Sequence, residues 1–329
     1  RQCCSFFYAV FYKKTIQYPM KFLTYYLLLL TYLSASTLNL SMSSSPSRLN
    51  PILANDSASS EISDWLFNGL FKYDKNGNPT VELAKSYNFE TPTKLIIKLR
   101  EDVLWHDNVK LTSKDIIFTY EKIIDPKVFN SIKSNFQEVQ SVKALDDYTI
   151  EVIYKNPYFK ALETWMVGIL PYHLLKDEKD LMTSSFNKNP IGTGSYKIKE
   201  FKQGQDIELL ANDKYFEDKP KIDRILYKFL PDSNTSFLYL KQKKLDIGGL
   251  DPIQVDRQLD NNFRNNYAIM QKPSFSFSYL GFNLKNEKFK DIRIRQALSL
   301  AIDRQELVDI LFFGYGKVCN GPFLPNSFA

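Results

Sequence analysis

The sequence predicts a mixed α/β fold, and two observations carry that prediction. Short apolar segments with the two-residue alternation of strands, such as Thr149–Tyr154 (TIEVIY), are interspersed with segments of helical periodicity, such as Ile292–Phe313. The chain also has no internal repeat and no long low-complexity linker. Strands and helices that alternate in this way are typical of α/β or α+β domains.

In the first half, a helix is predicted over 59–71, where Ile62, Leu66 and Leu70 lie at helical spacing and Gly69 suits termination. An Asn-Gly turn is expected in 72–80 (KYDKNGNPT), and strands are expected over 94–99 (KLIIKL) and 149–154. A second helix is expected to begin at the capping signal in 112–115 and to end before Asp125-Pro126.

In the second half, two strands over 195–200 and 206–210 form a hairpin around the turn at Gln203-Gly204. The remaining predicted elements are a strand over 225–230, a helix over 233–241, a strand over 276–283 and one long helix over 292–313.

The composition indicates a globular protein and argues against nucleic-acid binding. The 329 residues are 44% hydrophobic and 15% aromatic, which is ample material for a buried core. The formal charge is +6, but Arg1, Lys13, Lys14 and Lys21 stand in a leader without acidic residues. Without those four, 39 basic residues face 37 acidic ones, which leaves no uncompensated cluster of Lys and Arg for phosphates.

The N-terminal region has the three parts of a secretory signal. Met20-Lys21 is followed by the apolar run Phe22–Leu33 and by Ser34-Ala35-Ser36, whose small side chains suit cleavage. The run is shorter than the roughly 20 apolar residues of a membrane-spanning helix. We therefore predict a cleavable signal peptide at 20–36 and interpret residues 1–19 as translation upstream of the true start, outside the fold.

Cysteine usage is compatible with export. Cys3 and Cys4 fall in the leader, so Cys319 is expected to be a packed or idle thiol without a disulfide partner in the mature chain. No cysteine stands directly after the apolar run, so lipid attachment is not expected. A freely diffusing periplasmic protein fits these features.

The residues that could carry catalysis or metal binding have simpler structural interpretations. Gly192 and Gly194 in IGTGSY lack the lysine and the spacing of a phosphate-binding loop and predict a tight turn. His106 and His173 are 67 residues apart without a Cys or His cluster, so we expect a turn residue and a helix-start residue instead of a metal site.

The acidic residues of the same region give no acid-base pair. Without a nearby histidine or nucleophile, they are expected to be turn, capping and surface groups; they are Asp102, Asp107, Asp115 and Glu121. We predict no catalytic residue, no metal site and no cofactor, and hence no enzyme.

Five segments, in order, resemble the peptide/nickel type of extracellular solute-binding protein, family 5. They begin with LNPILANDSASSEISDWLFNGLFKYDKNG from residue 49, LREDVLWHDNVKLTSKDIIFTYEKIIDP from 99 and NPIGTGSYKIKEF from 189. PKIDRILYKFLPDSNTSFLYLKQKKLDIG from 220 and NLKNEKFKDIRIRQALSLAIDR from 283 complete the series. Each segment is weak alone, but their order is specific.

The resemblance implies a periplasmic-binding-protein-like fold of type II with two lobes, the second of them largely missing here. Lobe I would occupy 37–278 and the beginning of lobe II 279–329. The apolar stripe of the helix over 292–313 would then lack its partners, so residues 279–329 are expected to pack poorly. Ligand binding is expected to be weak, because closure of this fold needs both lobes.

The same resemblance implies binding and transport. The protein would be the periplasmic substrate-binding component of an ABC importer, a monomer that captures di- or oligopeptides between its lobes and delivers them to permease subunits in the inner membrane. The alternative within the family is binding of nickel or a nickel chelate. Some members of that branch use an arginine from lobe I, which 164–170 (TWMVGIL) does not offer.

The ligand contacts that the resemblance implies lie in three segments. The loop before the first helix supplies Asn55, Ser57 and Ser59, a short connection supplies Gly249 and Leu250, and a crossing strand supplies Phe277, Ser278 and Tyr279. Tyr279 is the leading candidate because a tyrosine combines apolar area with a hydroxyl. Asn130 stands where some peptide binders have an aromatic residue in the cleft.

Overall fold

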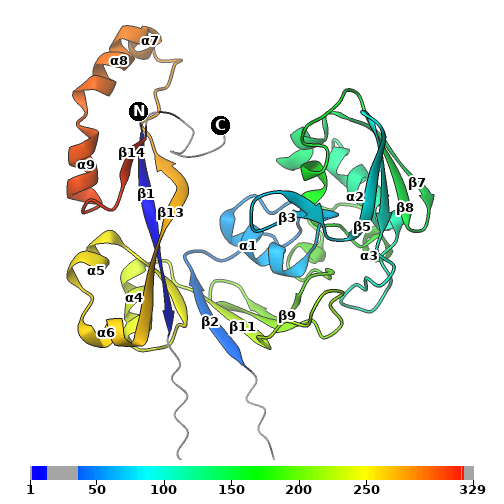
Figure 1. Cartoon of the computed structure of the whole chain (residues 1–329), viewed down its shortest axis with the longest axis horizontal. Helices are drawn as coiled ribbons and strands as arrows, with labels where there is room; N and C mark the ends of the chain where they lie inside the picture. The colour runs from blue at the N-terminus through cyan, green and yellow to red at the C-terminus, as the bar shows by residue number, and fades with distance from the viewer. Residues whose placement is uncertain (1, 13–35, 320, 322–329) are drawn as a thin grey trace, which may run out of the picture. The chain divides into compact units, whose positions relative to one another are not determined.

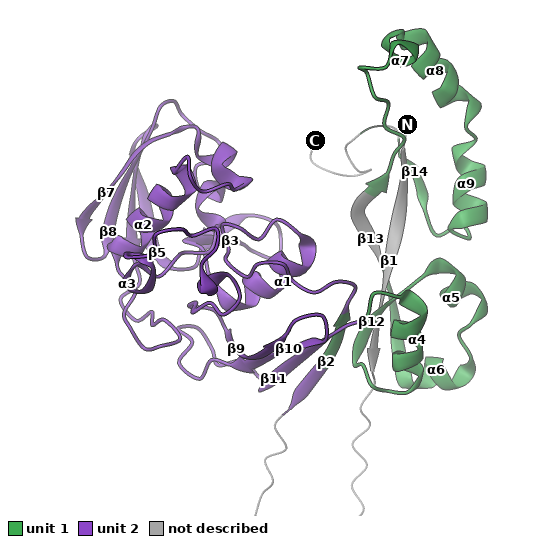
Figure 2. Ribbon diagram, turned by 180° about the vertical axis from the view of Figure 1, so that it is seen from behind, with its two compact units in different colours: residues 1–30, 39–41, 230–329 green, residues 31–38, 42–229 purple. Residues whose placement is uncertain are grey.

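The chain divides into two compact units (Figure 2). The structure is a computed structural model that describes the backbone of residues 2–12, 36–319 and 321, and the side chains of these residues except 2–12 and 272–276. Unit 2 comprises residues 31–38 and 42–229, and unit 1 comprises 1–30, 39–41 and 230–329. The mixed α/β composition is confirmed.

One sheet of unit 2 has the strand order β5-β6-β8-β7, antiparallel throughout. Its strands are β5 (Ala84–Thr91), β6 (Lys94–Leu99), β7 (Val139–Asp146) and β8 (Thr149–Tyr154), and the two central strands have the predicted bounds. Leu95, Ile97 and Val152 are fully buried, so alternation places them on the core face. Helix α2 (Ser113–Ile124) begins with the predicted capping box between Thr112 and Asp115.

The second sheet has the order β2-β11-β10-β9. It contains the predicted hairpin of β9 (Tyr196–Lys202) and β10 (Asp206–Ala211), with β11 (Arg224–Phe229) and β2 (Thr37–Met42) beyond it. Gly204 has φ +75°, a conformation that glycine adopts without strain, in the hairpin turn. The predicted Asn-Gly turn joins a small hairpin of β3 (Phe71–Tyr73) and β4 (Pro79–Val81).

Helix α1 (Ser57–Leu66) is shorter than the predicted 59–71. It starts earlier because the Asp56 side chain caps it, and it ends at Leu66 because Phe67 is extended. The backbone N–H of Leu70 then donates to the Trp165 carbonyl, so these residues bond to a neighbouring loop and not to their own helix. The other short helices of unit 2 are η1 (Ile132–Phe136), η2 (Glu163–Met166), α3 (Tyr172–Leu175) and η3 (Ser185–Asn187).

Unit 1 includes the segment from residue 230, which has a core of its own, and the lobe boundary at residue 279 stays a prediction. That core joins α4 (Ser233–Lys241), β12 (Ile247–Leu250), α5 (Pro252–Arg257), α6 (Asn261–Asn266) and β13 (Tyr267–Ser278). Phe237, Phe263 and Tyr267 pack in it, and the Tyr267 hydroxyl donates to the Leu240 and Leu245 carbonyls. Helix α4 has the predicted bounds.

Strand β1 (Gln2–Tyr12) differs from the expectation that residues 1–19 stand outside the fold. It lies between β12 and β13 and is antiparallel to both, and β14 (Lys317–Cys319) also pairs with it (Figure 1). The run QCCSFFYAVFY is rich in aromatic residues, which favour strands. Residues 13–19 and 20–35 of the predicted leader and signal peptide lie outside the described residues.

Cys319 is disulfide-bonded, so the expectation of an idle thiol is wrong. Its partner lies outside the residues whose side chains are described. The idle thiol was expected because the other two cysteines, Cys3 and Cys4, were assigned to a leader outside the fold.

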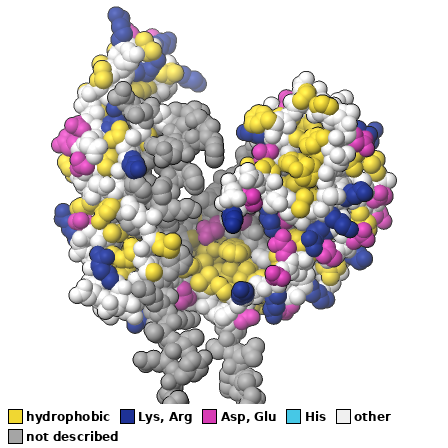
Figure 3. Space-filling model, in the orientation of Figure 1, with side chains coloured by type: hydrophobic (Ala, Val, Ile, Leu, Met, Phe, Trp, Pro, Cys, Tyr) yellow, Lys and Arg dark blue, Asp and Glu magenta, His cyan; other side chains and the backbone are white. Residues whose placement is uncertain are grey.

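The predicted helix over 292–313 is broken into α8 (Ile292–Ala301) and α9 (Arg304–Leu311), which follow α7 (Glu287–Lys290). The break falls at Ile302-Asp303 because the Asp303 side chain accepts the Glu306 N–H and caps a new helix. Helix α8 has no buried residue, and α9 buries Val308 alone, as expected for a segment that packs poorly. Apolar side chains accordingly lie at the surface over α7–α9 (Figure 3).

Candidate binding cavity

Unit 2 contains an open cavity of about 520 Å³. Helix α1, the start of β3, η1 and the segment from η2 to Gly168 form its walls. The lining combines aromatic rings with hydroxyl, amide and carboxylate groups, and a cavity of this size and mixture suits a small polar ligand.

Helix α1 presents one polar face to the cavity. Ser60, Ser63, Asp64 and Phe67 follow one another at spacings of three, one and three residues, which places them on the same side of a helix. The opposite side of α1 packs into the core through Ile62 and Leu66, both fully buried. Core packing of α1 therefore determines where Asp64 lies.

An aromatic cluster fixes the wall opposite. Trp165 is fully buried, its ring meets that of Phe136 edge to face at 5.3 Å, and its Nε1 donates to the Tyr154 hydroxyl at 3.0 Å. Tyr154 in turn donates to the Ala161 carbonyl, and the pKa of its hydroxyl is raised by burial. The cluster joins η1 and η2 to β8, so Glu163 on η2 has a defined place in the wall.

The cavity's charges do not balance. The Lys72 Nζ already forms ion pairs with the carboxylates of Glu217, at 2.8 Å, and Glu82, at 3.6 Å. Glu82 also accepts hydrogen bonds from Asn68 and from the Gly69 N–H, while its pKa is raised, chiefly by burial. These contacts leave no basic side chain of the described lining to neutralise other acids.

Asp64 and Glu163 are the unbalanced acids. Within the described part of the chain, neither carboxylate has a hydrogen bond or an ion pair, although both line the cavity. Asp64 is solvent-exposed, and partial desolvation, followed by repulsion from Glu61, raises the pKa of its carboxyl. Asp64 also lies in the last turn of α1, where the helix dipole adds negative potential. A cation entering the cavity would relieve this repulsion.

The IGTGSY segment bends at 193–195 and holds α1 in position. The Gly194 N–H donates to the Leu66 carbonyl at 2.8 Å, and a Cβ on Gly192 would lie 1.7 Å from that oxygen. His106 receives the Gly192 N–H on Nδ1 at 3.2 Å, so its proton is on Nε2, which donates to the Gly194 carbonyl at 3.0 Å. His106 is therefore the turn hydrogen-bonder that the sequence predicted.

The setting of His106 gives a testable pH dependence. Burial is the main cause that lowers its pKa to about 4, from an ordinary value of 6.5. The unfolded chain therefore binds the extra proton first as pH falls, so stability present above pH 6.5 is lost towards pH 4, by about 3 kcal/mol. In His106→Gln, urea unfolding between pH 7 and 4.5 should show a correspondingly flatter profile.

The comparison for that experiment is His173→Gln, which removes the other histidine of the chain, and the flattening expected of His106→Gln is judged against it. His173 lies in the first turn of α3, after Pro171, as predicted, and its Nε2 pairs with Asp107 at 2.8 Å. If the free energy of unfolding fell with pH equally in wild type and in His106→Gln, the lowered pKa of buried His106 would be contradicted.

The three predicted contact residues of unit 2 surround the start of α1 but do not line the cavity. Asn55 is exposed and accepts a hydrogen bond from Ser131 at 2.8 Å, and Ser57 is the exposed first residue of the helix. Ser59 is buried, and its hydroxyl donates to Asp56 and accepts the Ser47 N–H. Their roles in ligand binding stay predictions.

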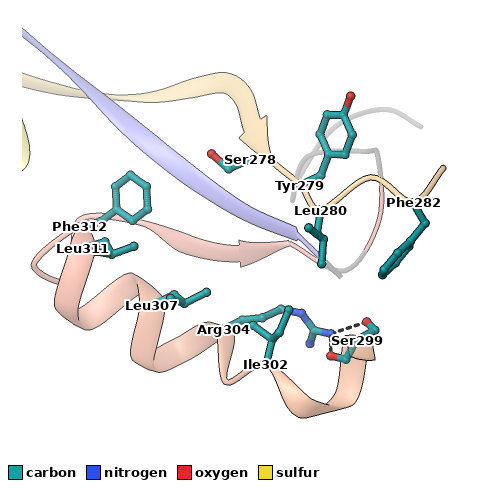
Figure 4. A pocket seen from close by; sticks show the side chains of 10 residues that line it. All are labelled: Ser278, Tyr279, Leu280, Phe282, Ser299, Ile302, Arg304, Leu307, Leu311 and Phe312. Carbon is teal, nitrogen blue, oxygen red and sulfur yellow. Dashed lines mark hydrogen bonds between the residues drawn. The ribbon is translucent and has the colours of Figure 1, made fainter. Parts of the chain in front are cut away.

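The other five predicted residues belong to unit 1. Gly249 and Leu250 lie on β12, and Leu250 is buried in the apolar core. Phe277 and Ser278 end β13; Ser278 and Tyr279 line a separate groove within unit 1 (Figure 4), and Tyr279 is 70% exposed. The structure therefore brings Ser278 and Tyr279 together and leaves Leu250 in the core.

Asn130 is occupied structurally, since its amide donates to the Ile123 and Val128 carbonyls. Sequence reasoning missed Asp64 and Glu163. The helical spacing of Asp64 with Ser60 and Ser63 could have indicated a polar face, whereas nothing local marked Glu163, because a non-local aromatic cluster places it.

The acids considered earlier act as caps and surface partners. Asp102 pairs with Arg100, and Asp115 accepts the Thr112 and Tyr172 N–H groups, with a pKa raised by burial. Across the described ranges, no three His, Cys, Asp or Glu side chains are grouped as metal ligands. In the same ranges, no helix has both the length and the hydropathy needed to cross a membrane.

Known proteins with this architecture bind solutes. The sequence profile of the bacterial extracellular solute-binding proteins, family 5, matches residues 78–329. The oligopeptide-binding protein AppA of Bacillus subtilis is 36% identical over 292 residues, which cover 86% of this chain and 52% of AppA.

Solved structures agree with the sequence matches. NikZ from Campylobacter jejuni in complex with Ni(L-His) superposes with a TM-score of 0.80 at 36% identity, covering 88% of this chain and 58% of NikZ. Bacillus subtilis AppA in complex with a nonapeptide superposes with a TM-score of 0.77 at 31% identity. This match covers 84% of this chain and 56% of AppA.

The fold is that of type II periplasmic binding proteins. The chain belongs to the bacterial extracellular solute-binding proteins, family 5, whose members bind and transport solutes. It spans about half the length of the curated relatives that it matches.

Proposed function

We propose that this protein is the periplasmic substrate-binding component of an ABC importer, which captures di- or oligopeptides and passes them to permease subunits. It would be exported by a cleavable signal peptide at 20–36, whose cleavage would separate β1 from the rest of the chain, and it would act as a monomer. Similarity to AppA, an oligopeptide-binding protein, supports the peptide as ligand. The single observation that carries the proposal is the cavity of unit 2 with its two unpartnered carboxylates.

The cavity's chemistry suits a positively charged part of a peptide. Asp64 and Glu163 supply acceptors for an ammonium or guanidinium group, and the aromatic rings of Phe67 and Phe136 offer apolar surface for the methylene stem. A peptide's own carboxylate has no unengaged basic side chain to meet among the described lining residues. Basic peptides should therefore bind here better than acidic ones.

The test is a titration with tri-lysine, tri-alanine and tri-glutamate, followed by NMR shifts of the Ser60, Ser63 and Asp64 amides. We expect tri-lysine to bind best, and Asp64→Asn to weaken its binding by about tenfold, since a lost charge-assisted contact costs roughly 1.5 kcal/mol. Glu61→Gln is the matched control, because it removes the same charge from the same helix outside the cavity lining. Indifference of the amide shifts to all three peptides would sink the proposal.

Binding of a nickel chelate is the second candidate, and the similarity to NikZ bound to Ni(L-His) favours it. Because the described residues group no three metal ligands, the metal would arrive with its own ligands. Native mass spectrometry after adding tri-lysine or a nickel–histidine complex separates the two: retention of the nickel complex alone would replace the peptide by the chelate.

A further inference from the structure

Two Asn-Gly dipeptides lie in the described part of the chain, and the fold places them in opposite surroundings. Asn76-Gly77 forms the exposed tip of the hairpin between β3 and β4, whereas Asn68-Gly69 is buried between the end of α1 and the start of β3. In an Asn-Gly dipeptide the backbone nitrogen of the glycine attacks the asparagine side chain easily, because glycine has no Cβ to obstruct the approach. The surroundings therefore decide which of the two dipeptides reacts.

At the hairpin tip, the reacting groups are accessible. Asn76 and Gly77 are both exposed, and among the described residues the Asn76 side-chain amide makes no hydrogen bond. Gly77 has φ +83°, and a Cβ at this residue would have no described neighbour within 4 Å, so no packing restrains the tip. The Gly77 N–H donates to the Asp74 carbonyl at 3.0 Å, which is a single bond that an exposed turn exchanges readily for water.

In the buried dipeptide, both reacting groups are occupied. Asn68 is 6% exposed, and its Nδ2 donates to Glu82 Oε1 at 3.0 Å and to the Tyr215 hydroxyl at 3.1 Å. Its Oδ1 accepts the Thr193 hydroxyl at 3.0 Å. The Gly69 N–H, which would have to attack, donates to Glu82 Oε2 at 3.0 Å. Reaction at Asn68 therefore requires that buried hydrogen bonds break first.

We infer that Asn76 is a site of spontaneous covalent modification, deamidation to aspartate and isoaspartate, and that the fold protects Asn68 from the same reaction. The Gly77 nitrogen loses its proton to solvent and forms a bond to Cγ of Asn76. The Cγ–Nδ2 bond breaks, and the amide nitrogen takes a proton from solvent and leaves as ammonia. The cyclic imide that results then adds one water molecule. Opening at one carbonyl gives aspartate, and opening at the other gives isoaspartate, in which the main chain runs through the side chain.

The modification changes the hairpin at the edge of the cavity. Either product adds a carboxylate near that of Asp74, which already accepts the N–H groups of Asn76 and Asn78 at 2.8 and 2.9 Å, so the two carboxylates repel each other. Isoaspartate also lengthens the main chain inside the loop that the pair of Tyr73 and Pro79 closes. Tyr73 lines the cavity, so the hairpin that the modification loosens is part of the cavity wall.

The experiment ages the full chain at mildly alkaline pH, folded and in guanidinium chloride, and maps the tryptic peptides by mass spectrometry. Trypsin cleaves after Lys72 and Lys75, so Asn68 and Asn76 fall on separate peptides, and fragment ions assign the modified residue. In the folded chain, we expect the mass gain of amide-to-acid conversion at least about tenfold faster at Asn76, because the buried hydrogen bonds of Asn68 must first break. In the unfolded chain, which has neither environment, the two rates should agree within about threefold.

The variant Asn76→Gln is the matched control. Its side chain is one methylene longer and closes a less favourable ring, so the mass gain of this peptide should disappear. Asn78 in the same peptide does not interfere, because Pro79 has no N–H with which to attack. After equal ageing, hydrogen exchange at the Lys72 and Thr80 amides, which belong to paired residues of the hairpin, should be faster in wild type than in the variant.

None of these measurements involves a ligand, so the result is independent of the proposed function. The inference would be overturned if the folded chain stayed unmodified at Asn76 while the unfolded chain reacted, or if Asn68 and Asn76 reacted equally fast in the folded chain. A mass gain that persisted in Asn76→Gln would overturn it as well. Equal hydrogen exchange in aged wild type and aged variant would overturn the loosening of the hairpin.

Discussion

Replacing Gly192 by alanine is expected to destabilise unit 2 by about 3 kcal/mol or more, because the new methyl group has no space. Its Cβ would lie 1.7 Å from the Leu66 carbonyl oxygen and 2.7 Å from the carbonyl carbon, which are backbone atoms that cannot rotate away. The shift would also break the hydrogen bonds that His106 makes to this loop. Urea unfolding at pH 7, followed by tryptophan fluorescence, measures the effect.

Gly281→Ala is the control for this prediction. A Cβ on Gly281 would meet only the ring of Tyr279, at 3.3 Å and beyond, and that exposed side chain can move. Its effect should stay within about 0.5 kcal/mol. Similar unfolding midpoints for the two alanine variants would show that the close approach of Gly192 to α1 is not a constraint on the fold.

Replacing Trp165 by alanine should cost about 3 to 5 kcal/mol and loosen the cavity wall. The indole is fully buried, packs edge to face on Phe136 and donates to the Tyr154 hydroxyl, so its removal leaves a hole and takes away one of the two hydrogen bonds of that hydroxyl. Because Phe136 and Glu163 line the cavity, hydrogen exchange in η1 and η2 should accelerate together with the loss of global stability.

Phe159→Ala gives the comparison for an aromatic side chain of the same region. Phe159 is 85% exposed, so its truncation should change the free energy of unfolding by less than about 0.5 kcal/mol. If Trp165→Ala left exchange in η1 and η2 unchanged, the aromatic cluster would not be what positions that wall.

Local sequence patterns predicted many elements to within a residue. Helix α4 and strands β6 and β8 have the predicted bounds, because alternation and capping residues mark them directly. The long helix over 292–313 failed as one element because periodicity continues through Asp303, whereas its side chain starts a new helix. The sequence alone does not show whether α8 continues through Asp303 or whether Asp303 caps a new helix.

The candidate site was less predictable than the fold. The family resemblance directed attention to Asn55, Ser57 and Ser59, which lie around the cap of α1, whereas the cavity uses the next turns of the same helix. Likewise β1 was assigned to a leader, because nothing local indicates which strands an apolar segment will pair with.

By itself, the sequence determined the mixed α/β class, the family and the turn that contains His106, because these depend on short-range patterns and on the order of motifs. Tertiary structure alone decided which charges stay unbalanced in the cavity and which apolar faces stay uncovered. The reason is physical, because ion pairs, hydrogen bonds and burial depend on partners distant in the chain. Lys72 forms its ion pair with Glu217, and Trp65 donates its hydrogen bond to the Tyr227 hydroxyl. Asp64 and Glu163 are candidates only because the fold places both in one cavity, where Lys72 pairs with Glu82 and Glu217 instead.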